Sequence, residues 1–335
     1  MGKNSLITIL VVFGIGVAFS SGNIPAAQKY NFFCGSSAST STTYAHSIAI
    51  AEAIGREVPE LTIKVMETAG GLENTRLYAR GEHEITSSTT FEAKDLYNGK
   101  GKFEGKPMPN ARLIFNEAPK AQQYFVVKTS NVNSLVELQG KPFGSGATGS
   151  TSEVHTKKIF DALGIQPKWF SSSWDHLTKG VQDGRIIGFA KSGGGADSMI
   201  VEVAVSKPIR FLGMSKEQRD KIIALGYLLI SIKWGTYPGQ NEEVSTVCYT
   251  MPWLIKKDLP EDLVYRMVKA VDKHYREIAK TDAMAQETID MFGSLIEATV
   301  KTPTIPLHPG AYKYLRELGV QIPEVMVPPE ARLTK

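Results

Sequence analysis

The fold is decided by residues 30–81, which read YNFFCGSSASTSTTYAHSIAIAEAIGREVPELTIKVMETAGGLENTRLYARG. The apolar run that Gly35 ends predicts a short strand, and residues 46–56 carry apolar side chains at helical spacing. Residues 61–66 alternate as a second strand, and the stretch that follows predicts a helix ended by Gly81. Strand, helix, strand and helix in succession indicate a doubly wound α/β sheet with largely parallel strands.

This alternation continues along the chain, and 335 residues are more than one hydrophobic core usually serves. We therefore expect two lobes. Strands predicted near 122–128 and 245–251 bracket a central unit with its own strands and helices, and the last helices would return to the first lobe. Lobe 1 is then formed by 28–122 with 246–335, and lobe 2 by 123–245. The two crossing strands would form a hinge, with the ligand between the lobes.

The N-terminus has the layout of a secretory signal peptide. Lys3 precedes the apolar run LITILVVFGIGVAF at 6–19, and small and polar residues follow it. That run is shorter than the ~20 residues that a membrane-spanning helix needs. Residues 1–27 are therefore predicted to be removed on export to the periplasm, with an uncleaved membrane anchor as the alternative.

Composition narrows the class of function. A net charge of +4 without a Lys/Arg stripe gives no support to nucleic-acid binding. The six histidines show neither metal-ligand spacing nor a catalytic constellation, so we expect a non-enzyme without catalytic residues, cofactor or metal. We also expect the protein to be a monomer. The two cysteines, Cys34 and Cys248, lie in apolar runs that predict strands. Buried free thiols are the expectation, and a disulfide is the alternative that export permits.

Three segments share one design, a loop of Gly, Ser and Thr between a predicted strand and a predicted helix. They are 35–44 (GSSASTSTTY), 144–153 (GSGATGSTSE) and 192–197 (SGGGAD). Each places a helix N-terminus, with its free N–H groups and partial positive charge, at the end of a strand. Such a site accepts an oxyanion without Lys or Arg, and hydroxyls add donors. Each loop alone is explained by ordinary helix capping, but three in one chain favour a ligand site.

Further candidate features lie in and around these loops. The second loop matches the G-x-G-x-x-G pattern, but the next strand, at 167–170, ends in serines where a dinucleotide site needs an acid, which argues against NAD. The polar stretch 87–90 is a candidate wall of the cleft, with a plain turn as the alternative. Aromatic candidates for the cleft, each with a core position as its alternative, are Tyr44, Trp169, Trp174, Trp234 and Tyr237.

At these loops the sequence resembles the TAXI-type solute receptors of TRAP (tripartite ATP-independent periplasmic) transporters. The motifs that carry the resemblance are, in order, the loop from Gly35 to Tyr44, ETAGGLENTRL at 67–77, Gly81-Glu82, LVELQGK at 135–141 with the Gly/Ser loop after it, SGG at 192–194, GTYPGQ at 235–240 and DLPEDLVY at 258–265. The first loop departs from the family pattern, because Ser and Thr replace glycines and one Tyr replaces a pair. Residues 83–88 also depart from it, since the family has an aliphatic strand ending in Gln there.

The resemblance implies a type II-like, two-lobed periplasmic-binding-protein fold, in which each lobe is a mostly parallel sheet flanked by helices. It implies closure on a small organic anion, a carboxylate such as a dicarboxylate or a glutamate-like acid, and delivery to the membrane permease subunits of a TRAP transporter. The alternatives are the same fold serving an ABC importer or a sensor, or a relative of pyrimidine-forming enzymes. With Ser87 added from the polar stretch, the predicted ligand residues are Ser36, Ser37, Thr40, Thr43, Tyr44, Ser87, Thr148, Gly149, Ser150, Thr151, Ser192, Gly193 and Gly194.

Overall fold

The computed structural model describes residues 28–332, so the predicted signal peptide lies outside the described residues. The elements in chain order are β1 (Tyr30–Gly35), α1 (Thr42–Glu57), β2 (Leu61–Met66), α2 (Gly71–Arg80), β3 (Ile85–Ser87), α3 (Thr90–Asn98), η1 (Gly101–Phe103), β4 (Ala111–Val127), η2 (Lys128–Ser130), η3 (Leu135–Leu138), β5 (Pro142–Ala147), α4 (Thr151–Leu163), β6 (Lys168–Ser172), α5 (Trp174–Gln182), β7 (Gly188–Gly193), α6 (Ser198–Ser206), β8 (Ile209–Phe211), α7 (Lys216–Ile223), β9 (Leu228–Ile232), β10 (Val244–Lys256), α8 (Glu261–Ile278), α9 (Ala283–Phe292), α10 (Leu295–Lys301), α11 (Pro309–Glu317), η4 (Glu324–Met326) and α12 (Pro329–Arg332).

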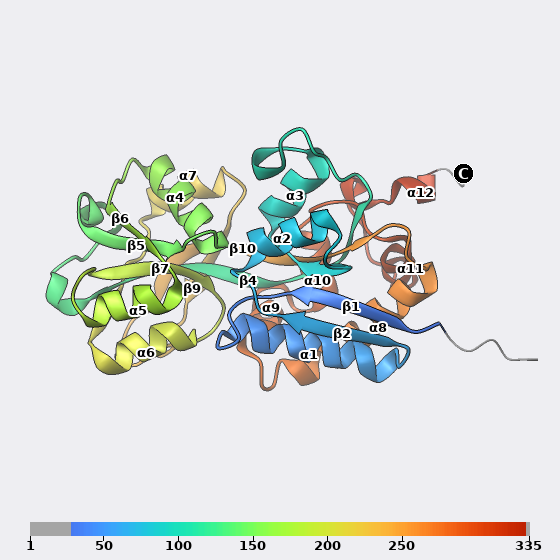
Figure 1. Ribbon diagram of the computed structural model, residues 1–335, viewed down its shortest axis with the longest axis horizontal. Helices are drawn as coiled ribbons and strands as arrows, with labels where there is room; N and C mark the ends of the chain where they lie inside the picture. The colour runs from blue at the N-terminus through green and yellow to red at the C-terminus, as the bar shows by residue number, and fades with distance from the viewer. Residues whose placement is uncertain (1–27, 333–335) are drawn as a thin grey trace, which may run out of the picture.

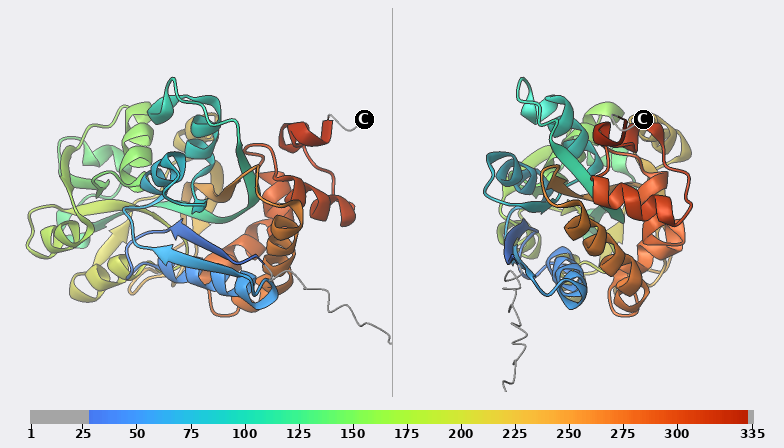
Figure 2. Two further views of the ribbon diagram at one scale, coloured as in Figure 1. Left: turned by 45° about the vertical axis from the view of Figure 1, so that its right-hand side comes forward. Right: turned by 90° about the vertical axis from the view of Figure 1, so that its right-hand side faces the viewer.

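The strands form one continuous sheet in the order β2-β1-β3-β10-β4-β7-β5-β6, with β8 beside β4 and β9 beside β10. The first lobe carries β1 between β2 and β3, all parallel. The second lobe carries β5 between β6 and β7, also parallel. The long strands β4 and β10 pair antiparallel with each other and run between the lobes (Figures 1 and 2). The predicted two-lobed α/β fold with helices flanking mostly parallel strands is confirmed.

Both crossing strands are longer than the sequence predicted. The strand expected near 122–128 is only the second-lobe end of β4, which begins at Ala111. The missing half is almost entirely buried although it carries Arg112, Asn116 and Glu117, whose side chains are held by distant segments. A charged residue inside a buried strand hides the alternation on which strand prediction depends.

Backbone irregularities mark the place where the strands pass from one lobe to the other. In β4, Ala118 has φ 46, a left-handed value that is uncommon for a residue with a side chain, and Pro119 follows it. In β10, the register with β4 shifts between Tyr249 and Met251. Bulges of this kind bend a strand and re-aim its side chains. Residues that follow the irregularity, Lys120 among them, therefore point differently from those before it.

A buried polar cluster lies beside this crossing, on the first-lobe side. The Glu117 carboxylate accepts from the Trp253 indole N–H (2.8 Å) and the Tyr275 hydroxyl (2.6 Å), and lies 2.9 Å from Nε2 of His46. Nδ1 of His46 lies 3.0 Å from Asp282. Burial disfavours the charged ring, but the two carboxylates outweigh it and raise the pKa of His46 to about 10.

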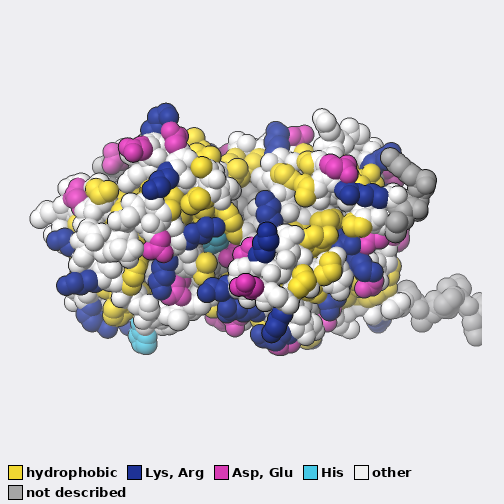
Figure 3. Space-filling view, turned by 90° about the horizontal axis from the view of Figure 1, so that it is seen from above, with side chains coloured by type: hydrophobic (Ala, Val, Ile, Leu, Met, Phe, Trp, Pro, Cys, Tyr) yellow, Lys and Arg dark blue, Asp and Glu magenta, His cyan; other side chains and the backbone are white. Residues whose placement is uncertain are grey.

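Three hydrophobic clusters fill the lobes. The first lobe has one large core under α1, α8 and α11, and the second lobe has a separate core on each face of its sheet. Cys34 and Cys248 are buried free thiols, as the apolar runs around them predicted. Over the described residues, no helix has both the length and the apolar composition needed to cross a bilayer. Seen from above, positive and negative side chains are intermixed over the surface rather than gathered into a basic stripe (Figure 3).

Candidate ligand-binding site

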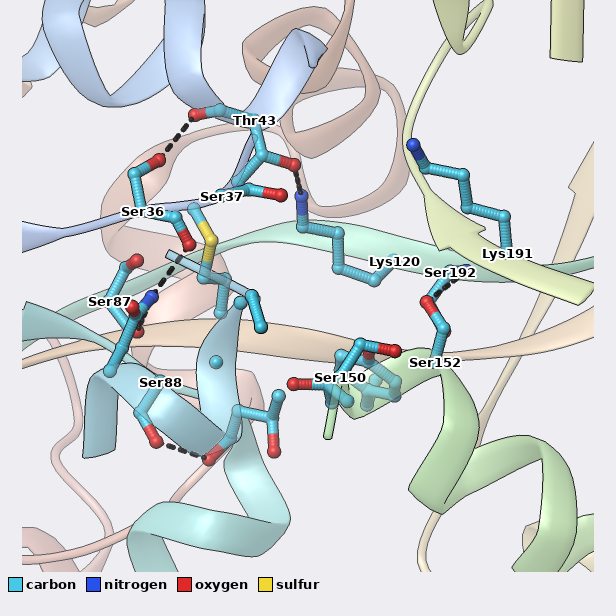
Figure 4. Close-up of a pocket in the computed structure, with 18 of the residues that line it drawn as sticks. Ser36, Ser37, Thr43, Ser87, Ser88, Lys120, Ser150, Ser152, Lys191 and Ser192 are labelled. Carbon is cyan, nitrogen blue, oxygen red and sulfur yellow. Dashed lines mark hydrogen bonds between the residues drawn. The ribbon is translucent and has the colours of Figure 1, made fainter. Parts of the chain in front are cut away.

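A pocket lies between the lobes, at the carboxyl ends of the parallel strands of both (Figure 4). Ligands of open α/β sheets gather at such strand ends. The crossing strands form its floor, through Lys120, Tyr249 and Met251. The full lining is Ser36, Ser37, Thr43, Ala69, Gly70, Gly71, Asn74, Ser87, Ser88, Thr89, Lys120, Ser150, Thr151, Ser152, Trp174, Lys191, Ser192, Tyr249 and Met251.

The N-termini of five helices, α1, α2, α3, α4 and α5, contribute residues to this lining. Each helix start carries a partial positive charge of about +0.5 and unpaired N–H groups. Four of them are capped by a side chain, Ser41 for α1, Thr89 for α3, Ser150 for α4 and Ser173 for α5. Helix α2 begins after Gly70, which has φ 120 and cannot cap with a side chain. The resulting field favours an anion in the pocket.

Hydroxyl groups of the second lobe are free to donate into the pocket, because each already accepts a hydrogen bond from a neighbouring donor. Ser150 Oγ accepts from Glu153 N at 3.2 Å, and Ser152 Oγ accepts from Ser192 N at 2.9 Å. Ser192 Oγ accepts in turn from the Gln122 amide at 2.9 Å. A hydroxyl that accepts such a bond keeps one proton to donate. These three hydroxyls therefore offer hydrogen-bond donors to a ligand.

Lys120 brings an ammonium group to the centre of the pocket. Its side chain is 6% exposed, and Nζ donates to Thr43 Oγ1 at 2.6 Å and contacts the sulfur of Met284 at 3.5 Å. Within the described part of the chain, no carboxylate oxygen lies within 4.0 Å of it. Burial lowers the pKa of Lys120 to about 8, against the opposing attraction of more distant carboxylates.

Lys191 is the second lysine of the pocket, and it is already paired. Its Nζ lies 3.0 Å from Asp197 Oδ2 and 4.6 Å from the ring centroid of Trp174. Asp197 is itself held as the cap of α6, accepting from Met199 N and Ile200 N. The charge of Lys191 is therefore neutralised inside the second lobe. Figure 4 shows Lys191 and Lys120 on neighbouring strands at the pocket.

Hydrogen bonds tie the lobes together around the pocket. Leu72 N donates to Thr151 Oγ1 at 3.0 Å, so the uncapped start of α2 uses a hydroxyl of the opposite lobe. Ser198 Oγ donates to Thr40 O at 2.8 Å. Gly195 N donates to Glu287 Oε1 at 2.7 Å. The described conformation is thus a closed one.

Residues 35–319 match the model of the NMT1-like family. The chain belongs to the NMT1-like family. Its fold is similar to that of the alkanesulfonate-binding protein SsuA from Xanthomonas axonopodis pv. citri bound to MOPS, with 12% identity, a TM-score of 0.50, and coverage of 88% of this chain and 92% of that one. The periplasmic aliphatic sulphonate binding protein SsuA from Escherichia coli aligns at 13% identity and a TM-score of 0.46, over 86% of this chain and 84% of that one.

The sequence-predicted residues of this NMT1-like protein divide into two groups. Those that line the pocket are Ser36, Ser37, Thr43, Ser87, Ser150, Thr151 and Ser192. Two of these use their protons inside the first lobe, since Ser36 donates to Thr43 O and Ser87 donates to Gly35 O. Those outside the lining are Thr40, Tyr44, Thr148, Gly149, Gly193 and Gly194.

The residues outside the lining have other neighbours. The Tyr44 hydroxyl donates to Val65 O, and Gly149 N donates to Glu153. Thr148 is exposed. The third predicted loop departs most from the predicted strand–loop–helix design, because β7 extends through Gly193. Gly194 lies close to Glu287, since a Cβ on Gly194 would be 2.6 Å from Glu287 Oε2. This segment faces the first lobe at the edge of the pocket.

The aromatic candidates separate in the same way. Trp174 lines the pocket, whereas Trp169 packs on Phe143 and Phe160 in the second-lobe core. Tyr237 is buried with its hydroxyl on Gln123, and Trp234 is 74% exposed.

The two pocket lysines and the Gly70-Gly71 pair were missed by the sequence analysis. The expected site worked without Lys or Arg, and the structure corrects this, because both lysines stand within apolar strands. A lone lysine inside an otherwise buried strand was the available signal, since burying an ammonium is costly and calls for a reason. Gly70-Gly71 was noted only as part of a family motif, because a helix start without a capping side chain has no capping signature.

Proposed function

We propose that this protein is an exported solute receptor that closes its two lobes on a small organic anion, a carboxylate, and delivers it to a membrane transporter. The observation that carries the proposal is the buried ammonium of Lys120, which has no carboxylate partner among the described residues within 4.0 Å. A buried charge is stable only when it is paired or hydrogen-bonded. A bound carboxylate would supply the missing partner.

The surroundings of Lys120 support an anion over a neutral or cationic ligand. Helix N-termini of both lobes and the hydroxyl donors of Ser150, Ser152 and Ser192 act in the same direction as the ammonium. Closure removes water, which strengthens each of these hydrogen bonds. The same groups would also accept a sulfonate, the ligand class named for the SsuA protein of similar fold, so sulfonates are the second class to test.

The hinge of this receptor is proposed at the irregular points of the crossing strands. Lobe 1 would comprise 28–122 with 246–335 and lobe 2 would comprise 123–245, with bending at Ala118 and at the Tyr249–Met251 bulge. A bulge and a left-handed residue interrupt the regular ladder, so the two strands can bend there while the sheets on either side stay rigid.

The anion should be tested first by native mass spectrometry of freshly purified protein, and then by calorimetry with carboxylates, methanesulfonate and a cationic control such as choline. Lys120→Met is expected to weaken anion binding at least about tenfold, because a hydrogen bond to a charged group contributes about 1.5–3 kcal/mol. Lys168→Met, at an exposed lysine of β6, is the matched control and should bind as the wild type does. Unchanged affinity of Lys120→Met would refute the proposal.

Delivery to a TRAP-type permease is the finer part of the proposal, and it is supported by the ordered motifs that resemble TAXI receptors. Uptake into membrane vesicles that hold the cognate permease tests it. Receptor-dependent uptake driven by an ion gradient without ATP is the expected result. A strict need for ATP would instead assign the protein to an ABC importer.

A further inference from the structure

We infer that the ligand is a monocarboxylate of about two to four carbons without an ammonium group, rather than a dicarboxylate or a glutamate-like amino acid. This inference rests on the proposed function, because it presumes that a carboxylate occupies the pocket. Three independent features of the closed pocket carry it: the number of unpaired cations, the chemistry of the lining and the size of the space.

The pocket holds one unpaired ammonium, not two. Lys120 has no carboxylate partner within 4.0 Å among residues 28–332, but Lys191 lies 3.0 Å from Asp197 Oδ2. Asp197 is 1% exposed, and its other oxygen caps α6 by accepting from Met199 N and Ile200 N. It cannot leave Lys191 without exposing the start of that helix. A ligand with one negative charge is matched by Lys120, and a second carboxylate would enter without a free cation.

The lining also argues against a zwitterion. None of the residues that line the pocket is Asp or Glu. Buried carboxylates of the first lobe near the crossing strands have partners of their own: Glu117 accepts from Trp253 and Tyr275, Asp282 lies against His46, and Glu287 accepts from Gly195 N. An α-ammonium group would therefore meet the positive charge of Lys120 and of the helix N-termini, and would find no carboxylate in the lining.

The space itself is small. The volume of the pocket is about 50 Å³. One water needs roughly 10–15 Å³ of such space, so the pocket takes roughly three to five groups of that size. Part of the wall is apolar, formed by Ala69, Trp174 and Met251, and suits a methyl or methylene group. A short acid with a small tail fits this description, and a glutamate-sized chain does not.

The test compares ligands of matched shape by calorimetry on the full, mature protein. Lactate carries a hydroxyl group where alanine carries an ammonium group. Malonate differs from butyrate mainly by its second carboxylate. Propionate, pyruvate, succinate and glutamate extend the series. We expect at least one of propionate, lactate, pyruvate or butyrate to bind, with alanine and malonate at least tenfold weaker than lactate and butyrate respectively.

The outcomes separate this inference from the proposed function. If malonate, succinate or glutamate binds more tightly than every monocarboxylate, the inference is overturned while the receptor for carboxylates stands. If no carboxylate binds and Lys120→Met changes nothing, the proposed function fails and the inference falls with it.

A charge variant provides a second, sharper readout. Asp197→Asn keeps an oxygen that can cap α6 but releases Lys191 from its counter-charge. We expect this variant to shift the ratio of lactate to malonate affinity at least fivefold towards malonate. Glu217→Gln, at an exposed site on α7, makes the same change of charge away from the pocket and should leave the ratio unchanged. A ratio that does not move in Asp197→Asn would contradict the charge argument.

Discussion

Adding one methyl group at Gly71 should weaken the closure of the two lobes without destabilising the fold. It is the first residue of α2, and a Cβ built there would lie 2.9 Å from Thr151 Oγ1 and 3.2 Å from Thr89 Cγ2. Real Cβ atoms do not approach an oxygen as closely as 2.9 Å, so Thr151 must move away. Its hydroxyl accepts the hydrogen bond of Leu72 N across the cleft. Gly71→Ala should therefore weaken the closed conformation specifically.

The size of the effect follows from that hydrogen bond. A typical intramolecular hydrogen bond contributes about 0.5–1.5 kcal/mol, which corresponds to a loss of ligand affinity of about two- to twelvefold. The unliganded fold should not suffer, because Gly71 does not have a positive φ and alanine is the better helix former. Replacing glycine by alanine at a compatible site stabilises a protein by about 0.4–1 kcal/mol. Weaker binding is thus expected together with an equal or higher melting temperature.

Calorimetry with the tightest acid of the panel measures the affinity, and small-angle scattering with and without that acid measures closure. Thr151→Ala is the partner variant, because it removes the oxygen that the new methyl group would meet. In a double-mutant cycle, Gly71→Ala should cost much less in the Thr151→Ala background than in the wild type. Equal costs in both backgrounds, or unchanged affinity of Gly71→Ala, would refute the reasoning.

Three predictions concern pH. Because burial lowers the pKa of Lys120 to about 8, the affinity for a carboxylate should be flat from about pH 6 to 7, where the acid is ionised, and should fall towards tenfold per pH unit above 8. Calorimetry that finds the affinity flat to pH 9.5 would contradict this. The raised pKa of His46, about 10, contributes stability that is fully present below pH 6.5 and is lost as pH rises towards 10. In urea unfolding, the free energy of unfolding should therefore decline by up to about 1.4 kcal/mol per pH unit between pH 6.5 and 8. The variant His46→Gln should not show this decline. Burial raises the pKa of Glu287 to about 7, so its stability contribution is lost as pH rises from 4.5 through 7. The variant Glu287→Gln keeps the acceptor for Gly195 N–H. It should be about 1–3 kcal/mol more stable than the wild type at pH 8 but not at pH 4. An equal gain in stability at both pH values would contradict the titration of Glu287.

The layers of the fold were predictable because local patterns specify them. Residues 30–81 alternate between strand and helix periods, and the structure has β1, α1, β2 and α2 there in that order. The first half of β4 was not predictable from local pattern. Arg112 is buried against Glu330 and Asn116 against Thr302, and partners two hundred residues away leave no trace in the periodicity of the strand.

The site was predictable in kind but not in its charges. Loops of Ser, Thr and Gly before helices indicated donors at strand ends, and the topology brings the first two of these loops to one pocket. Whether a given hydroxyl faces a ligand or caps a helix depends on its partner, and Ser150 does both. Lys120 reaches the pocket only because β4 bends at Ala118, a conformation that no local sequence signal announced.

The position of β10 has a consequence for how the polypeptide is assembled. Within the first lobe this strand lies between β3 and β4, although more than one hundred residues of chain separate β4 from β10. While the chain is being synthesised, β4, β7, β5 and β6 can come together as soon as residue 193 has emerged, but β3 keeps a bare edge until residues 251–256 arrive. Contacts of such long sequence separation form late, and bare edges invite aggregation. The strands β4 to β7 can therefore pair before the first-lobe sheet is complete, whereas the second-lobe cores still await Val244, Val247 and Tyr249 of β10.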